Sequence, residues 1–238
     1  MSIINILNLD VVLYMVKFLS DKEKLIFCST NKYFRELLDY IKFDDLYEYD
    51  QIKDLPFITK FKKISYKSHD VYVPKYVTYL TFGDNYNERI KPCFFYFPKR
   101  KFKKILPPGL TYLKFGWFFN QPIKKYIPNN VTHLIFGNNF NQPIGKIIID
   151  DIAFSQKKRT IERYLPPKLI YLEFGDNFNQ SIEGCIPDNV THLKFGYYFN
   201  QPIKEYIPNS VTHLTLKKSY YEQNKQFINT NICVQTFT

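Results

Sequence analysis

The sequence lacks the features that point to catalysis, secretion or a membrane. It contains no G-x-S-x-G, Walker or H-E-x-x-H motif, so we expect neither an enzyme nor a bound cofactor. No run of 18 apolar residues occurs, and no basic stretch precedes an apolar one at the start. Four cysteines without close pairing argue against a zinc site and a disulfide framework (Cys28, Cys93, Cys185, Cys233). These absences predict a cytoplasmic protein with reduced thiols and no membrane partner.

A repeat dominates the rest of the sequence. F-N-Q-P-I occurs three times, with near copies F-N-Q-S-I at Phe178–Ile182 and Y-N-E-R-I at Tyr86–Ile90. Each copy follows an L-x-F-G tetrad, whose leucine we call the anchor. The six anchors include one without a complete tetrad (Leu80, Leu113, Leu134, Leu172, Leu193, Leu214). Three of the five anchor spacings are 21 residues, and the other two, 33 and 38, contain insertions.

The period of 21 residues decides the architecture. It is too short for a pair of helices or a propeller blade, but it suits one short strand and a return path, as in leucine-rich repeats. Within a strand such as Val131–Phe136, Leu134 and Phe136 share the core face. The glycine after each tetrad phenylalanine permits a sharp departure from the strand. The sequence therefore predicts a parallel β-solenoid with strands at the anchors.

One polar residue recurs in all five copies of the pentapeptide. It is an asparagine, and stacked strands would place its copies about 4.8 Å apart. We expect these side chains to form a structural ladder that satisfies backbone groups of the turns (Asn87, Asn120, Asn141, Asn179, Asn200).

These residues resemble the FNIP repeat family, a relative of leucine-rich repeats found chiefly in slime moulds and giant viruses of amoebae. The resemblance covers residues 72–216, with insertions near 91–106 and 145–164. Glutamine replaces the isoleucine of the family signature. Residues 217–238 are expected to cap the solenoid, with a last strand at Ile232–Phe237.

The first fifty residues differ, because they contain no glycine or proline and show helical apolar spacing. Asn8 is a candidate N-cap, Ser20 and Glu23 form a candidate capping box, and Thr30 or Asn31 precedes a third stripe. We expect three short helices over residues 1–50. Residues 51–71 then form a linker or a degenerate cap.

This segment resembles an F-box. Leu9-Asp10, Val12-Leu13, Phe18-Leu19, Phe27-Cys28 and Phe34-Arg35 match the family pattern in order, although Asn8 replaces the usual proline. The resemblance implies docking on the linker subunit of a cullin-RING ubiquitin ligase. The residues expected to carry this contact are apolar (Leu9, Val12, Leu13, Phe18, Leu19). The alternative is a helical cap on the solenoid.

Charge is distributed unevenly. Residues 1–55 have a net charge of −3 and residues 56–238 a net charge of +14. A basic cluster at Lys99–Lys104 lies among aromatic residues in the first insertion. Three interpretations remain open: a solubilised loop, a nucleic-acid contact by phosphate neutralisation and base stacking, or steering of an acidic protein target.

The outward strand positions form two rows that we expect to line the concave face of the solenoid. They are the candidate target-binding residues (Tyr79, Tyr112, Lys114, His133, Ile135, Tyr171, Glu173, His192, Lys194, His213). Tyrosine is favoured at interfaces. Stacking of like residues stabilises a sheet even where nothing binds. No metal site is expected at the histidines, because only Glu173 lies near them.

The function predicted from these parts is a substrate-recognition adaptor of a cullin-RING ubiquitin ligase. The F-box would dock on the linker subunit, and the repeats would bind a target protein. If the protein is viral, the ligase belongs to the host cytoplasm. The alternatives are a repeat-protein binding module without a ubiquitin role and nucleic-acid binding through the basic repeat region.

Overall fold

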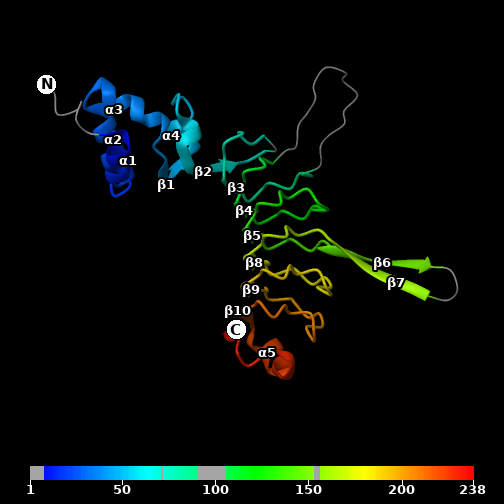
Figure 1. Ribbon diagram of the computed structural model, residues 1–238. Coiled ribbons are helices and arrows are strands. Elements are labelled where there is room, and N and C mark those ends of the chain that lie inside the picture. The colour runs from blue at the N-terminus through cyan, green and yellow to red at the C-terminus, as the bar shows by residue number, and fades with distance from the viewer. Residues whose placement is uncertain (1–7, 71, 91–105, 153–155) are drawn as a thin grey trace, which may run out of the picture. The chain divides into compact units, whose positions relative to one another are not determined.

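The chain forms two compact units in the computed structural model, which describes residues 8–70, 72–90, 106–152 and 156–238 (Figure 1). The first unit runs to Tyr66 and includes Tyr76–Thr78. The second comprises Lys67–Lys75 and Tyr79–Thr238. None of the helices in the described ranges is long and apolar enough to cross a membrane.

Three short helices open the first unit, each with its own cap. They are α1 (Leu9–Val16), α2 (Asp21–Ser29) and α3 (Lys32–Glu36), followed by the 3-10 turn η2 (Leu37–Asp39). Asn8 accepts from the Asp10 N–H at 3.3 Å, and Asn31 accepts from the Phe34 N–H at 2.9 Å. Ser20 and Glu23 form a complete capping box. The caps predicted from the sequence are confirmed.

The first unit continues past residue 50, where the sequence pattern predicts its end. Strand β1 (Phe43–Glu48), helix α4 (Tyr49–Ile52), the turn η3 (Ile58–Lys60) and strand β2 (Phe61–Ser68) follow, and β1 pairs with β2 in parallel. The Phe61 ring lies 4.7 Å from that of Phe43 and 6.0 Å from that of Phe57, measured between centroids. These rings join the same core as Val12 and Cys28, which is why the unit extends this far.

A buried ion pair ties α2 to β1. The Lys24 ammonium, only 6% exposed, lies 2.8 Å from the Asp21 carboxylate and 3.3 Å from that of Asp44. Asp21 also accepts from the Asp45 N–H at 2.7 Å. Burial alone would lower the pKa of Lys24, but the bonds to Asp21 and Asp44 outweigh it and raise that pKa above its ordinary value.

The second unit is a parallel sheet in which every strand lies beside the next one of the repeat, as predicted (Figure 1). Within this unit the order is β3-β4-β5-β8-β9-β10-β11. Adjacent strands align anchor to anchor, from Leu80 to Leu214. The strand bounds are β3 (Tyr79–Phe82), β4 (Tyr112–Lys114), β5 (His133–Ile135), β8 (Tyr171–Glu173), β9 (His192–Lys194), β10 (His213–Lys217) and β11 (Cys233–Phe237).

Identical side chains stack to make the core of the second unit. The tetrad phenylalanines form one row, with centroids 5.5–5.6 Å apart from Phe82 to Phe195. The pentapeptide phenylalanines form a second row at 6.1–6.2 Å from Phe119 to Phe199. Within one repeat the two rings lie 3.8–3.9 Å apart. Each repeat therefore buries two rings against the repeats on both sides.

The tetrad glycines have a different role from the one expected. Among described residues only Gly184 is a glycine with positive φ, so the tetrad glycines do not serve an unusual backbone angle. A Cβ atom at Gly137 would instead collide with the carbonyl of Gly116, and one at Gly116 with the carbonyl of Gly83. Glycine is required because neighbouring backbones approach too closely for a side chain.

The second insertion and the C-terminal end both have regular structure. Strands β6 (Gly145–Ile152) and β7 (Gln156–Arg163) form an antiparallel hairpin, which places the backbone of Asp150 opposite that of Lys158. Helix α5 (Lys218–Asn224) and the turn η4 (Lys225–Phe227) precede β11. Buried Tyr220 of α5 packs against Phe199. The basic cluster at 99–104 lies outside the described residues.

Candidate functional site

The outer face of the strands carries a continuous stack of six rings. From Tyr79 through Tyr112, His133, Tyr171 and His192 to His213, neighbouring centroids lie 4.3–6.3 Å apart. The shortest step joins His192 and His213, whose planes differ by 3°. The three imidazoles are exposed and the three phenol rings are half-buried. The sequence-predicted aromatic row is therefore brought together as one surface, which we call the strand face.

Hydroxyl groups hold the histidines in place. His133, His192 and His213 each have Nδ1 within 2.9–3.0 Å of the hydroxyl oxygen of the preceding threonine. The neighbouring strands desolvate His133 and lower its pKa, and the charge of His192 lowers it further. The rings of His192 and His213 lie parallel, and the Nδ1 atom of each faces the hydroxyl of its own preceding threonine. No group of three potential metal ligands occurs among the described residues.

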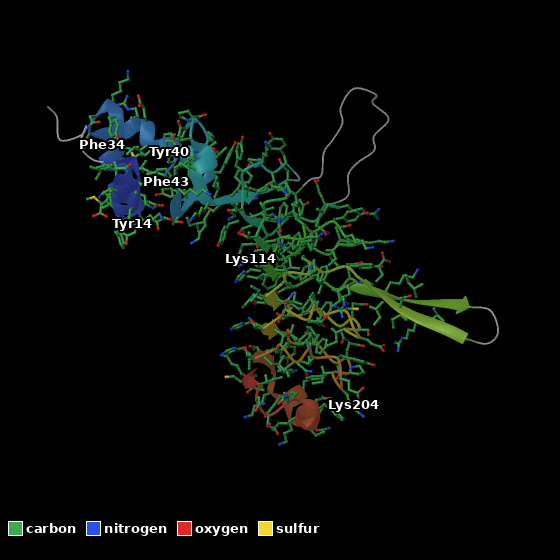
Figure 2. All side chains as sticks on the ribbon, viewed as in Figure 1. Tyr14, Phe34, Tyr40, Phe43, Lys114 and Lys204 are labelled. Atoms are coloured by element: carbon green, nitrogen blue, oxygen red, sulfur yellow. The ribbon has the colours of Figure 1, made fainter. Side chains whose placement is uncertain are left out.

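The second predicted row adds charge to this face. Lys194 pairs with Glu173 at 2.8 Å, and the Tyr171 hydroxyl donates to the same carboxylate at 2.7 Å. Burial, and then the bond to Glu173, raise the pKa of Tyr171. Lys114 is exposed on β4 and labelled in Figure 2, and Ile135 lies half-buried on β5. A hollow of about 570 Å³ borders Tyr171, Glu173 and Lys194. This region offers both signs of charge beside flat rings.

The five asparagines form a ladder along another edge of the repeats. The Oδ1 atom of each of the first four accepts from the backbone N–H of the next asparagine at 2.9–3.0 Å, and the last donor in this series is Asn200. The same Oδ1 atom also accepts from the side chain of the glutamine that directly follows the donating asparagine, at 2.9–3.1 Å. Four of the five amide oxygens, those of Asn87, Asn120, Asn141 and Asn179, are thus fully used in joining one repeat to the next.

In the first unit, the residues expected to bind a linker subunit divide into two groups. Val12 is buried at 3% exposure, and Leu9, Leu13 and Leu19 pack partly buried against the core. Phe18 is 74% exposed. Phe18 belongs to a second apolar stripe, which runs along α1 and the residues just after it. The sequence analysis did not identify this stripe. The stripe consists of Val11, Tyr14, Met15 and Phe18, which are 47–74% exposed. Tyr14 is labelled in Figure 2.

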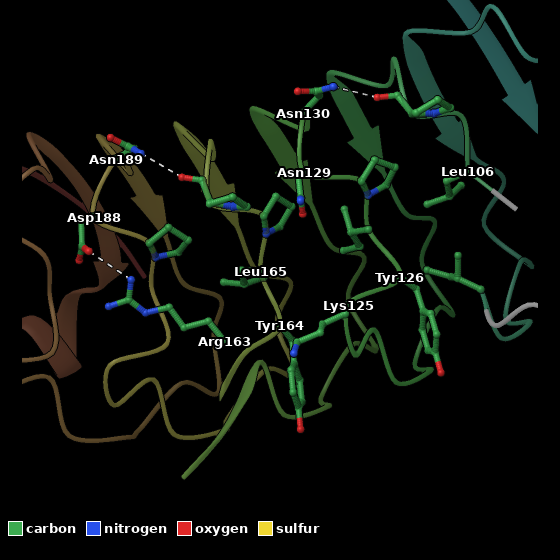
Figure 3. A pocket seen from close by; sticks show the side chains of 17 residues that line it. Leu106, Lys125, Tyr126, Asn129, Asn130, Arg163, Tyr164, Leu165, Asp188 and Asn189 are labelled. Atoms are coloured by element: carbon green, nitrogen blue, oxygen red, sulfur yellow. Dashed lines mark hydrogen bonds and ion pairs between the residues drawn. The ribbon is translucent and has the colours of Figure 1, made fainter. Parts of the chain in front are cut away.

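One hollow of the second unit is built from the proline turns (Figure 3). It measures about 880 Å³. Asn130 and Asn189 donate to the carbonyls of Pro108 and Pro167 at 3.0 and 2.9 Å. Arg163 pairs with Asp188 at 3.1 Å. These polar groups are engaged with one another, so their visible role is to tie successive turns together.

Comparison with known proteins locates the repeats independently. The model described as "FNIP Repeat" matches residues 100–127, 119–149, 156–198 and 178–219. A protein of Acanthamoeba polyphaga mimivirus named as F-box and FNIP repeat-containing is 41% identical over 68 residues, covering 29% of this chain and 23% of the relative. A second, named as FNIP repeat-containing, is 32% identical over 123 residues, covering 50% and 31%.

The chain thus spans less than a third of either relative's length. A crystal structure of CroV588, described as a novel circular LRR protein, covers 82% of this chain and 29% of its own, at 30% identity and a TM-score of 0.48. The match of the family model, together with the repeated tetrads and pentapeptides seen in the fold, shows that this chain belongs to the FNIP repeat family.

Proposed function

We propose that this protein is a substrate-recognition adaptor of a cullin-RING ubiquitin ligase, acting in the cytoplasm without catalysis of its own. The first unit docks on the linker subunit of the ligase, and the strand face of the repeats holds a target protein. Relatives named for both an F-box and FNIP repeats support this pairing of functions. They support it by likeness alone.

The observation that carries the proposal is the second apolar stripe of the first unit. The spacing i, i+3, i+4, i+7 puts Val11, Tyr14, Met15 and Phe18 along one side, away from the buried Val12 and Val16. A helix of a free-standing domain needs only one apolar side. Tyr14 also borders a hollow of about 640 Å³, whose lining combines Leu13 and Tyr40 with charged side chains such as Lys17 and Asp44. An exposed apolar stripe beside a hollow suits a protein partner.

The target site proposed for the repeats is the strand face. Its rings are rigid and amphipathic, with few rotors to immobilise on binding. Lys114, Glu173 and Lys194 supply charges that orient a partner. Because both signs are present, the face suits a target with paired acidic and basic groups, and not only an acidic one.

Binding to a purified linker subunit tests the adaptor role. We expect the full chain to retain the subunit in a pull-down, and Phe18→Glu and Met15→Glu to abolish retention because each places a charge in an apolar contact. Leu46→Glu is the matched control, since Leu46 is also exposed (54%) and lies on β1. Circular dichroism verifies folding. A folded wild-type chain that retains no linker subunit contradicts the proposal and favours a repeat protein that binds without ubiquitin.

A further inference from the structure

The turns that follow the tetrad glycines carry a pattern that the strand face does not explain. At three of the five repeats, both residues after the glycine are Asp or Asn, which are usual in turns. Those positions are Asp84-Asn85, Asn138-Asn139 and Asp176-Asn177. At the other two repeats the same positions hold Trp117-Phe118 and Tyr197-Tyr198. The side chains at these two positions thus differ completely between repeats, although the tetrad and pentapeptide pattern around them stays the same.

The turn itself has no need of these rings. The Phe118 N–H donates to the Asp84 carbonyl at 2.9 Å, and in an Asp-Asn repeat the Asn177 N–H donates to the Asn138 carbonyl at the same distance. The four rings are nonetheless 41–60% exposed. Lys217 lies over the Tyr197 ring at 3.4 Å from its centroid, which holds that ring in position. Exposed rings in place of turn residues indicate contact with a ligand.

The two aromatic turns stand at opposite ends of a hollow of about 790 Å³. Phe118 follows β4 and Tyr198 follows β9, and three strand steps separate them, roughly 15 Å at ordinary strand spacing. Between them the floor consists of asparagines, among them Asn139, Asn141 and Asn177. None of the residues that line the hollow carries a charge.

The floor also presents amide groups that the fold leaves unused. The Oδ1 atoms of Asn120 and Asn141 each accept two hydrogen bonds. Their Nδ2 groups donate to no partner within the described ranges. Asn177 donates its Nδ2 to the Oδ1 of Asn139 at 3.2 Å, and in the same ranges its own Oδ1 accepts nothing. The floor of the hollow therefore offers both hydrogen-bond donors and an acceptor beside the rings.

We propose that this hollow binds a neutral oligosaccharide about the length of a trisaccharide. A pyranose ring has an apolar C–H face that packs on an aromatic ring, and hydroxyl edges that both donate to and accept from amides. Phe118 and Tyr198 supply the rings, and the asparagine amides supply the polar floor. Because no cation or anion lines the hollow, a phosphorylated or acidic ligand has no partner there. The proposal is independent of the adaptor role.

The single tryptophan makes the proposal measurable, because Trp117 directly precedes Phe118, which lines the hollow. The probes are maltotriose, cellotriose, chitotriose and mannotriose, added to the full chain. We expect at least one to change the emission of Trp117 saturably, with a dissociation constant of about 1 mM or tighter. Saturation-transfer NMR should place the contact at the C–H groups of the sugar.

The repeats themselves provide conservative variants. Phe118→Asn and Tyr198→Asn install the residue found at Asn139 and Asn177, so the turn keeps a sequence the fold already uses. Each should weaken binding about tenfold by loss of a stacking ring. Phe227→Asn, which removes an exposed ring elsewhere in the second unit, should leave affinity within about twofold.

Three results overturn the proposal. One is that none of the four trisaccharides gives a saturable response. Another is unchanged affinity in the double variant Phe118→Asn, Tyr198→Asn. The third is a saturable response to a capped neutral peptide, acetyl-Ser-Gly-Asn-Gly-amide, at lower concentration than to any of the sugars. That result would assign the hollow to a peptide. Failure of the linker pull-down leaves this test unaffected.

Discussion

The two compact units of this chain hold their cores together by different means. In the first unit each contact is made once, by residues of different kinds: three separately capped helices, a ring cluster around Phe61, and the buried pair of Lys24 and Asp21. In the second unit a few contacts recur in every repeat, as rows of leucines, phenylalanines and asparagines.

This difference determines how far a substitution is felt. In the first unit a lost contact has no copy elsewhere, so its cost depends on its own burial and pairing. In the second unit a residue in the middle of a row touches the repeats before and after it. An altered central repeat therefore affects both neighbours, whereas a terminal one affects a single neighbour. Substitutions matched in type but different in position can test this directly.

The largest effect is expected from Phe140→Ala in the second unit. Phe140 is fully buried between Phe119 and Phe178, with centroids 6.1 Å from each. Removing the ring should lower the free energy of unfolding by about 3–5 kcal/mol. Urea unfolding followed by Trp117 emission measures it. Phe140→Leu, which fills more of the space, should cost clearly less; equal costs would show that the row is not packed as described.

The buried pair of the first unit should rank next. Lys24→Met removes the ammonium from Asp21 and leaves a carboxylate only 2% exposed without its cation, at an expected cost of about 3 kcal/mol. Helical circular dichroism during urea unfolding follows this unit. Lys53→Met is the control, because the pair of Lys53 with Asp50 is exposed and should be worth less than about 0.5 kcal/mol. Indistinguishable variants would contradict the ranking.

The asparagine ladder predicts a smaller effect that depends on position. Asn141→Ala deprives the Asn179 N–H and the Gln180 side chain of their acceptor, at a cost of about 1–2 kcal/mol. Asn200 is the last of the ladder, and its Oδ1 accepts no hydrogen bond within the described ranges. Asn200→Ala should therefore be nearly neutral. Equal losses for the two variants, in the same unfolding assay, would falsify the ladder as a chain of acceptors.

The smallest effect concerns pH on the strand face. The pKa of His133 is lowered from its ordinary 6.5 in the folded chain, so the unfolded chain takes up the proton first. The stability this contributes is present above pH 6.5 and is lost as the pH falls below it. His133→Tyr, the residue type of Tyr112 and Tyr171, should lose part of that dependence. Melting temperatures of both proteins at about pH 7.5 and pH 5 provide the comparison.

Much of the second unit could be predicted because its pattern is repeated. The six anchors predicted where the strands lie, and the period of 21 residues predicted that they stack in parallel. A single tetrad would have predicted neither. The hairpin β6–β7 lies in an insertion and has no copy, so periodicity carried no information about it. The role that we predicted for the tetrad glycines was wrong, because a sequence does not reveal how closely two backbones approach.

The first unit was harder because it has no internal copies. Strands β1 and β2 lack the L-x-F-G tetrad, and their contribution to the helical core depends on how Phe43, Phe57 and Phe61 meet in space. The exposed stripe of Val11, Tyr14, Met15 and Phe18 was present in the sequence at helical spacing. It was missed because one apolar stripe already accounted for the helix. The aromatic turns were visible too, once positions after each glycine are compared.

The collision that excludes a side chain at Gly137 also bears on how such an array lengthens. From the second tetrad glycine onward, at Gly116, Gly137, Gly175 and Gly196, the space that the glycine leaves is occupied by the carbonyl of the preceding repeat. A duplicated block of 21 residues carries both its own glycine and the carbonyl that will fill the next one, wherever in the repeat the block is cut. New copies are thus compatible with old ones without further mutation. Both insertions in this chain lie outside the segment from tetrad to pentapeptide, where they leave the contact between glycine and carbonyl unchanged.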